Sequence, residues 1–349
     1  MNTLECLKTL CQTGGPSGYE APVADLAAHL LTPWMDEVWT DRLGNVIGLR
    51  RCGRPNAKKL LLDAHLDQIG LMVTGAEGGY LRFASIGGVD PRMLPDREVT
   101  ILTQPPRLGV IACLPPHVLS AEDREKAPAL GEYYVDTGLS QETVEREIPV
   151  GTPMVFRESF LELAGGKICS GALDDRACFA ALLRTVELLN LEQLDVDLYI
   201  MGSTREETGG TGAMVGTCTI DPDFCVAVDV THGATPDSAK GRAYDLGGGP
   251  AVGIGPNMTR WMTRRMLDKA QELDIPVQKE VMGGDTGTNA WGMQICNEGI
   301  ATAVLSLPLR YMHTPVEVVD LADLEQTAQL LAAFTRKLGE EGAQASWIC

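Results

Sequence analysis

Four short apolar runs in this sequence each lead into an acidic residue or a histidine, and this pattern strongly restricts the fold. The runs cover residues 58–65, 196–203, 224–230 and 300–307. Short, continuously apolar runs are typical of parallel strands that are buried on both faces of a sheet. Ligands bind outside the carboxyl ends of the strands in such sheets, so we expect the residues that end or follow these runs to form one site.

Helical patterns between the runs complete an α/β arrangement. Apolar residues recur at helical spacing over 175–190, from Phe179 to Leu189. The strong turn signal at Gly14-Gly15-Pro16 separates two helical segments within residues 1–33. Further elements are expected as a hairpin at 37–49 and as helices near 259–273 and 320–338.

The pattern changes between about residues 69 and 163. Short β-rich runs alternate there with Gly, Pro and Asp turns, and the only suggestion of a helix is the charged stretch near residues 120–127. This alternation is typical of a small barrel or sandwich. We therefore predict a mixed-sheet α/β/α domain formed by residues 1–68 and 164–349, with a small β-barrel or sandwich inserted at 69–163.

Charge and cysteine content exclude several classes of protein. The net charge of −18 argues against nucleic acid and anionic membranes as partners, because an acidic surface is repelled by both. None of the ten cysteines lies in a C-x-x-C pair, which makes a zinc ribbon improbable, and their apolar surroundings fit reduced thiols. The amino terminus lacks the pattern of a secretory signal, and no apolar run is long enough for a membrane helix. A reducing cytoplasm is the expected location.

The histidines are few, which makes their surroundings informative. His65 ends the first run, and Asp67 follows at a spacing that places both side chains on one side of an extended segment. Asp67 could therefore hold the imidazole for a metal ion. A histidine that is simply hydrogen-bonded at a strand end explains this motif equally well. His29 is expected to be structural, and His117 is expected in a surface loop.

Two carboxylate pairs have both a structural and a chemical interpretation. Asp174-Asp175 begins a helix, where paired aspartates usually serve as a cap, although a carboxylate there can also bridge two metal ions. Glu206-Glu207 follows the run at 196–203 and precedes a glycine-rich turn, so one glutamate can bind a metal while the other acts as a general base. The glycines argue against a merely solvated acidic turn, because they imply a specific backbone path.

Asp229 and His313 repeat the pattern of His65. Asp229 ends the run at 224–230, and His313 follows the run at 300–307. Each motif is modest alone, but all of them are expected at one edge of the sheet. Their agreement indicates a metal-dependent site rather than a set of unrelated structural residues.

Taken together, these motifs resemble those of the tetrahedral (TET-type) metallo-aminopeptidases, also called glutamyl aminopeptidases or, in older naming, cellulase M. The resemblance rests on motif order and spacing over nearly the whole chain, and no single motif would suffice. The matching segments are Ala64-His65-Leu66-Asp67, Leu173-Asp174-Asp175-Arg176, Glu206-Glu207-Thr208-Gly209, Val228-Asp229-Val230-Thr231 and Arg310-Tyr311-Met312-His313-Thr314-Pro315.

The resemblance implies two divalent metal ions per subunit and a role for each site residue. One ion would take His65 and Asp229, and the other would take Glu207 and His313. Asp174 would bridge both ions and would be joined to Asp175 by a cis peptide bond. The resemblance further implies that Glu206 is the general base and that Asp67 supports His65.

The implied chemistry is the hydrolysis of the first peptide bond of short peptides. Three carboxylates and two imidazoles suit zinc, with cobalt or manganese as alternatives. Glu206 would take a proton from the attacking water and pass it to the leaving amine. The insert at 69–163 would be a dimerisation barrel, and dimers would assemble into a homo-oligomeric tetrahedral dodecamer.

Two positions depart from the family pattern. Gln68 stands where the family usually has glutamate, and Asn289 stands where it often has aspartate. Neither position is an implied metal ligand, so the departures bear on substrate preference rather than on catalysis. Fewer carboxylates near the pocket would tolerate an acidic substrate side chain.

Three other functions remain open from the sequence. A related dinuclear amidohydrolase, such as a deacylase or carboxypeptidase, would need a cationic anchor for a substrate carboxylate, for which Arg310 is the candidate. A non-catalytic assembly protein with structural metals is disfavoured because Glu206 is present. A cellulase is disfavoured because glycosidases use two opposed carboxylates rather than metal-type histidines.

Overall fold

The computed structural model describes residues 2–157, 159–190, 192–239 and 241–342. In this part of the chain the largest element is an eight-stranded mixed sheet with the order β1-β2-β12-β3-β13-β16-β14-β15. Strands β12, β3, β13 and β16 are parallel, as the apolar runs predict. The strand bounds are Glu37–Thr40 (β1), Val46–Arg50 (β2), Lys58–His65 (β3), Val196–Ser203 (β12), Phe224–His232 (β13), Ala251–Ile254 (β14), Gln278–Val281 (β15) and Ala301–Leu309 (β16).

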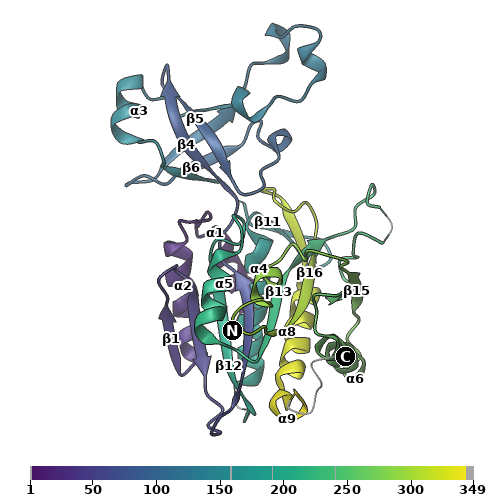
Figure 1. Cartoon of the computed structure of the whole chain (residues 1–349). Coiled ribbons are helices and arrows are strands. Elements are labelled where there is room, and N and C mark those ends of the chain that lie inside the picture. The colour runs from purple at the N-terminus through teal and green to yellow at the C-terminus, as the bar shows by residue number, and fades with distance from the viewer. Residues whose placement is uncertain (1, 158, 191, 240, 343–349) are drawn as a thin grey trace.

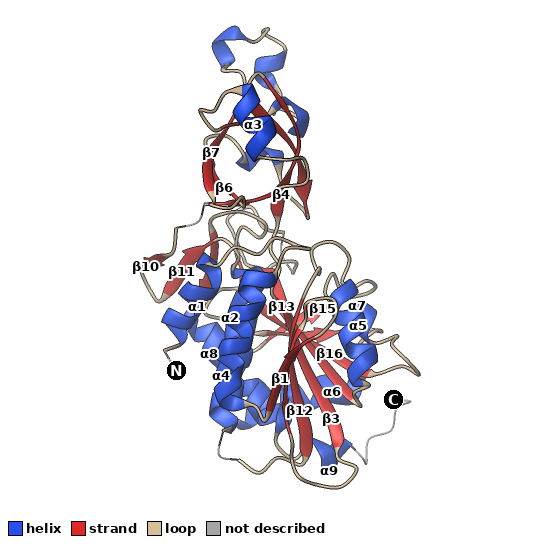
Figure 2. Ribbon diagram, turned by 90° about the vertical axis from the view of Figure 1, so that its left-hand side faces the viewer, coloured by secondary structure: helices blue, strands red, loops and turns tan. Residues whose placement is uncertain are grey.

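Helices cover both faces of this sheet, which gives the three layers expected of an α/β/α domain (Figure 2). Alternation along β3 explains the layers, because Leu60 and Leu62 join the core beneath one helical layer while Leu61 joins the core beneath the other. The first layer holds α1 (Thr3–Gln12), α2 (Ala21–Leu31), α4 (Leu173–Leu189), α6 (Arg260–Glu272) and α8 (Leu321–Thr335). The second holds α5 (Thr211–Ile220) and α7 (Ala290–Met293), and α9 (Leu338–Gly342) follows α8.

The predicted β-rich insert forms a closed six-stranded barrel with its own apolar core, so the sandwich alternative is wrong. Figure 1 shows the barrel beyond one end of the large sheet. The charged stretch near residues 120–127 contains only a short 3-10 turn at Asp123–Glu125, whereas an α-helix that the sequence did not suggest, α3, covers Gln141–Glu147. The barrel strands are Gly70–Glu77 (β4), Tyr80–Ile86 (β5), Glu98–Ile101 (β6), Arg107–Ala112 (β7), Tyr134–Asp136 (β8) and Pro153–Phe156 (β9).

A small antiparallel sheet connects the end of the barrel with the start of α8. It consists of β10 (Leu161–Leu163), β11 (Lys167–Ser170) and β17 (Glu317–Asp320) in that order. Strand β11 leads directly into Asp174, and β17 begins with Glu317. This sheet therefore places two segments that are distant in sequence beside each other near the predicted site. None of the helices in the described ranges combines the length and apolar character that a membrane span requires.

Candidate metal centre

The predicted site residues converge at the carboxyl edge of the parallel strands. His65 is the last residue of β3 and lies in register with Ser203, the last residue of β12. Glu206 and Glu207 follow β12 in the next turn, and Asp229 lies near the end of β13. This convergence follows from strand direction, because parallel strands deliver their carboxyl ends to the same edge.

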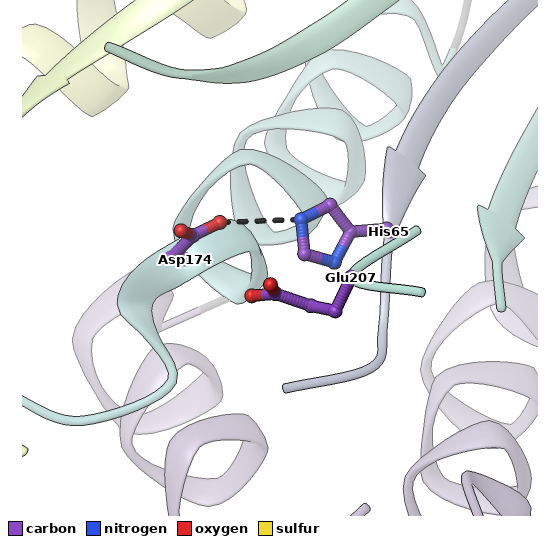
Figure 3. Close-up of side chains that lie close together, drawn as sticks. All are labelled: His65, Asp174 and Glu207. Atoms are coloured by element: carbon purple, nitrogen blue, oxygen red, sulfur yellow. Dashed lines mark hydrogen bonds and ion pairs between the residues drawn. The ribbon is translucent and has the colours of Figure 1, made fainter. Parts of the chain in front are cut away.

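Asp174 lies between the two histidines of the site. Its Oδ1 is 3.2 Å from His65 Nε2, and its Oδ2 is 3.4 Å from His313 Nε2. Glu207 completes this half of the cluster, with Oε2 at 3.3 Å from His313 Nε2. Figure 3 shows the carboxylates of Asp174 and Glu207 on the same side of the His65 ring. Each of the two carboxylate oxygens of Asp174 thus faces a different imidazole. A carboxylate that bridges two metal ions requires this arrangement.

The backbone around Asp174 is held by a carboxylate that the sequence interpretation missed. Glu317 is 2% exposed and accepts hydrogen bonds from the backbone N–H groups of Asp174 (3.1 Å) and His313 (2.9 Å). The implied cis peptide between Asp174 and Asp175 is present. Asp175 in turn accepts a hydrogen bond from the His65 backbone N–H at 3.1 Å. An acidic residue inside the apolar run Val316–Val319 was the available signal for Glu317.

Asp67 orders the Glu206-Glu207 turn as well as lying near His65. Its two carboxylate oxygens accept hydrogen bonds from the backbone N–H groups of Glu206 (3.0 Å) and Glu207 (3.1 Å). Its Oδ1 is also 3.5 Å from His65 Nδ1, while its backbone oxygen lies closer to that nitrogen, at 3.1 Å. Arg205, immediately before the pair, has a left-handed φ of 59°, which gives the turn the specific backbone path that the glycines indicated.

Two overlapping groups of side chains are compact enough to hold a cation. The ligand atoms of His65, Asp174 and Glu207 all lie within 4.8 Å of one another, and so do those of His65, Asp175 and Asp229. The predicted ligand set did not include Asp175, whose Oδ1 is buried and has no hydrogen-bond partner in the described part of the chain. The structure therefore offers an additional oxygen beside Asp229.

Burial makes ionisation of the carboxyl groups in this cluster costly. Burial and the neighbouring Asp174 raise the pKa of Glu207 to about 8, and burial together with Asp175 raises the pKa of Asp229 well above its usual range. Burial alone would raise the pKa of Asp174 as well, but His313 and His65 hold the pKa of this carboxyl below its usual range. The hydrogen bond with Asp174 raises the pKa of His313 to about 9. Bound cations would stabilise the ionised carboxylates, so the donor set fits divalent metals.

The barrel approaches the site through two consecutive glycines after β5. A Cβ atom added to Gly87 would lie 3.2 Å from Glu207 Oε2, and one added to Gly88 would lie 2.7 Å from His313 Nδ1. Only the smallest residue fits at Gly88 without moving the imidazole. The insert is therefore in direct contact with the site, which the sequence did not indicate.

A cavity of about 340 Å³ opens beside Glu206 and extends toward α7. Glu206 itself is half-buried, with Oε2 at 3.8 Å from His65 Nε2. Met214, Asp285 and Trp291 are among the residues on the walls of the cavity. Glu206 thus lies between the candidate metal cluster and open space, where a general base can reach a reacting molecule.

The two departures from the family pattern occupy buried polar environments. The Gln68 side-chain oxygen accepts a hydrogen bond from Arg176 Nη2 at 2.8 Å. Asn289 Nδ2 donates to Asp63 Oδ2 (2.8 Å) and to Ser203 Oγ (3.0 Å), a donation that an aspartate could not make.

Arg310, the candidate anchor for a substrate carboxylate, donates its Nε to the Ala234 carbonyl oxygen at 2.7 Å. His29, expected to be structural, and His117, expected in a surface loop, are both exposed.

Solved aminopeptidases share this fold over nearly the whole chain. The chain is similar to an aminopeptidase of the archaeon Desulfurococcus kamchatkensis, with 36% identity, 99% of each chain covered and a TM-score of 0.91. The M42 glutamyl aminopeptidase family matches residues 44–330. The chain therefore belongs to the M42 peptidase family, whose members are metallopeptidases, and it is an aminopeptidase of that family.

Two further relatives cover nearly the whole chain. The lysyl aminopeptidase of Pyrococcus furiosus is 37% identical over 340 residues, which cover 96% of this chain and 97% of the relative. The TET1 peptidase of Pyrococcus horikoshii, which can assemble into a tetrahedron or a large octahedral shell, is 28% identical with a TM-score of 0.85. That comparison covers 97% of this chain and all of the other.

Proposed function

We propose that this protein is a dinuclear metal-dependent aminopeptidase that removes first residues from short peptides. The position of Asp174, with one oxygen toward His65 and the other toward His313, carries this proposal. A carboxylate in that position suits two adjacent cations. The proposed ligands are those that the family resemblance implies: His65, Asp174, Glu207, Asp229 and His313.

The metals would supply Lewis acidity and an activated water, and zinc, cobalt and manganese all suit this mixture of oxygen and nitrogen donors. Glu206 would act as the general base. Its carboxylate lies beside His65 and borders the cavity, so it can take a proton from a water at the cluster and deliver it to the leaving amine. Burial raises the pKa of Glu206, which favours a group that both accepts and returns a proton.

Asp67 would act as a positioning residue. It holds the backbone N–H groups of both Glu206 and Glu207, so it fixes the base relative to a metal ligand. Its proximity to His65 Nδ1 supports the additional role of orienting that ring.

Assembly and location complete the proposal. We expect dimers to form through the barrel and to associate into a tetrahedral dodecamer, on the model of the related TET1 peptidase. A cytoplasmic location is supported by the cysteines in the described ranges, all of which are free thiols. The net charge of −18 supports peptides, rather than nucleic acid or membranes, as partners.

The neighbouring glutamates allow a direct test. Glu206→Gln should reduce kcat on leucyl-p-nitroanilide by about 10²–10⁴-fold while elemental analysis still finds two metals per subunit. Glu207→Gln is the matched variant and should lose one metal, as should His313→Ala. Wild-type turnover by Glu206→Gln would refute the assignment of Glu206 as the general base. Full metal content in both Glu207→Gln and His313→Ala would contradict the proposed ligand set.

A further inference from the structure

A second acidic group, Glu280, lies on the α5/α7 face of the large sheet and is not part of the proposed metal site. It belongs to β15 and is half-buried. Its Oε1 accepts a hydrogen bond from Thr231 Oγ1 on β13, and its Oε2 accepts one from Ser306 Oγ on β16 at 2.6 Å. The side chain thus reaches across the intervening strand β14 toward the middle of the sheet.

A glycine lies on β14 beside Glu280, where the side chain crosses this strand. Gly253 on β14 is the register partner of Glu280, and a Cβ added to it would meet Val304 at 2.9 Å on this same face. Gly253 adds no side chain to this face between Glu280 and the two hydroxyl groups. A side chain at this position would press against Val304 on the face that Glu280 crosses.

The carboxylate of Glu280 is consequently close to the proposed metal ligand Asp229. Asp229 and Thr231 are two residues apart on one strand, so their side chains lie on the same face. Asp229 is also the register partner of Ser306. With adjacent strands about 4.8 Å apart, the Glu280 carboxylate lies on the order of 5–8 Å from Asp229. This distance suits a group that meets the side chain of a substrate whose first peptide bond lies at the metals.

The surroundings keep Glu280 available as a hydrogen-bond acceptor. A carboxylate can accept about four hydrogen bonds, and the two hydroxyl groups occupy only part of this capacity. No lysine or arginine of the described residues forms an ion pair with it. Burial raises the pKa of Glu280, and the hydrogen bonds from Ser306 and Thr231 oppose that rise. The fold therefore supports an acceptor in a partly desolvated position, where attraction to a cation is stronger than in water.

We propose that Glu280 selects substrates whose first residue has a cationic side chain, lysine or arginine. This inference rests on the proposed aminopeptidase function. A lysine side chain carries three donors on a flexible four-carbon stem, which can extend from the metals to this carboxylate. An acidic first residue would be repelled, in contrast to the tolerance expected from Gln68 and Asn289.

Asp285 is the competing candidate, because it lies on the wall of the cavity beside Glu206. Its Oδ1 accepts a hydrogen bond from the Gly287 backbone N–H at 3.0 Å within its own turn, and the residue is exposed. Exposed charges attract a cation only weakly. The half-buried Glu280 is therefore the stronger determinant of charge selectivity.

The test compares the hydrolysis of lysyl- and norleucyl-p-nitroanilide, which separates the effect of charge from that of chain length. The metal-loaded wild type should have a kcat/KM for the lysyl substrate that exceeds the norleucyl value by at least about tenfold. Glu280→Gln should bring this ratio close to one while the norleucyl value stays within about threefold. Glu280→Asp, which keeps the charge and guards against a folding defect, should retain part of the preference, and Asp285→Asn should retain all of it.

Binding of non-hydrolysed probes provides the second measurement. Calorimetry on zinc-loaded wild type should show tighter binding of lysine hydroxamate than of norleucine hydroxamate, and Glu280→Gln should abolish the difference. An unchanged lysine preference in Glu280→Gln, a preference lost in Asp285→Asn, or a wild type without any lysine preference would overturn the inference. Failure of the proposed function is distinct, because the wild type would then hydrolyse neither substrate, while the hydroxamates would still report the charge preference.

Discussion

Replacing Glu317 by alanine tests whether a residue that contacts no proposed substrate position controls metal binding. The carboxylate of Glu317 joins two segments that each carry a proposed ligand, since it accepts the backbone N–H groups of Asp174 and His313. Glu317→Ala would leave both N–H groups, one buried and one partly buried, without this acceptor. The positive φ of 61° at His313 makes its backbone especially dependent on such support.

The expected magnitude follows from the two hydrogen bonds. Each hydrogen bond to a charged group contributes about 1.5–3 kcal/mol, so the pair contributes roughly 3–6 kcal/mol to the native arrangement. Water entering the space left by the side chain would offset part of this loss. If about half of the lost stabilisation weakens metal binding, the metal affinity falls by roughly 10–100-fold. This is the usual effect of removing a group that orients metal ligands.

Metal titration followed by competition with a chelator measures this affinity directly. Asp320→Asn is a matched control on the same strand, because Asp320 pairs with Lys167 at 3.1 Å and caps α8 through the Ala322 N–H at 2.9 Å. This control should lower the urea midpoint slightly without changing metal affinity, since asparagine is also a good helix cap. Glu317→Ala with wild-type metal affinity and turnover would refute the argument that this carboxylate positions Asp174 and His313.

Two further predictions concern the contact with the barrel and the role of the metals in stability. Gly88→Ala should displace the His313 ring, which lies 2.7 Å from the added Cβ, and should lower kcat by at least about tenfold with a small change in the urea midpoint. Gly75→Ala, in the same barrel but with open space around its Cβ, should leave kcat unchanged. Metal removal should lower the free energy of unfolding by about 2.7 kcal/mol per site when the free metal had been 100 times its Kd. Equal urea midpoints before and after chelation would contradict this.

The parallel strands and the residues at their ends could be predicted because they depend on local sequence patterns. The apolar run that became β3 needs to be buried on both faces, and this requirement fixes its place inside the sheet and the position of His65 at its end. Asp229 near the end of β13 follows from the same reasoning. The family resemblance then added roles that no single pattern could supply.

The supporting residues could not be predicted, because their partners are distant in sequence. Glu317 and the backbone of Asp174 are separated by 143 positions, and only the pairing of β11 with β17 brings them together. The approach of Gly88 to His313 likewise depends on where the barrel lies relative to the sheet. Strand β14 is only four residues long and β15 is polar, so neither gives a clear signal and the position of Glu280 was hidden as well.

The acidic residues around the site fall into two groups with different effects on stability. Asp67 and Glu317 accept hydrogen bonds from the backbone of the segments that carry the proposed ligands. Asp175, Glu207 and Asp229 instead are buried where ionisation is costly, so their pKa values are raised. The first group can order the site without a cation, whereas the second is destabilising until a cation arrives. Metal binding should therefore add stability to an already ordered framework rather than create the fold, so the apoprotein should retain its secondary structure on chelation.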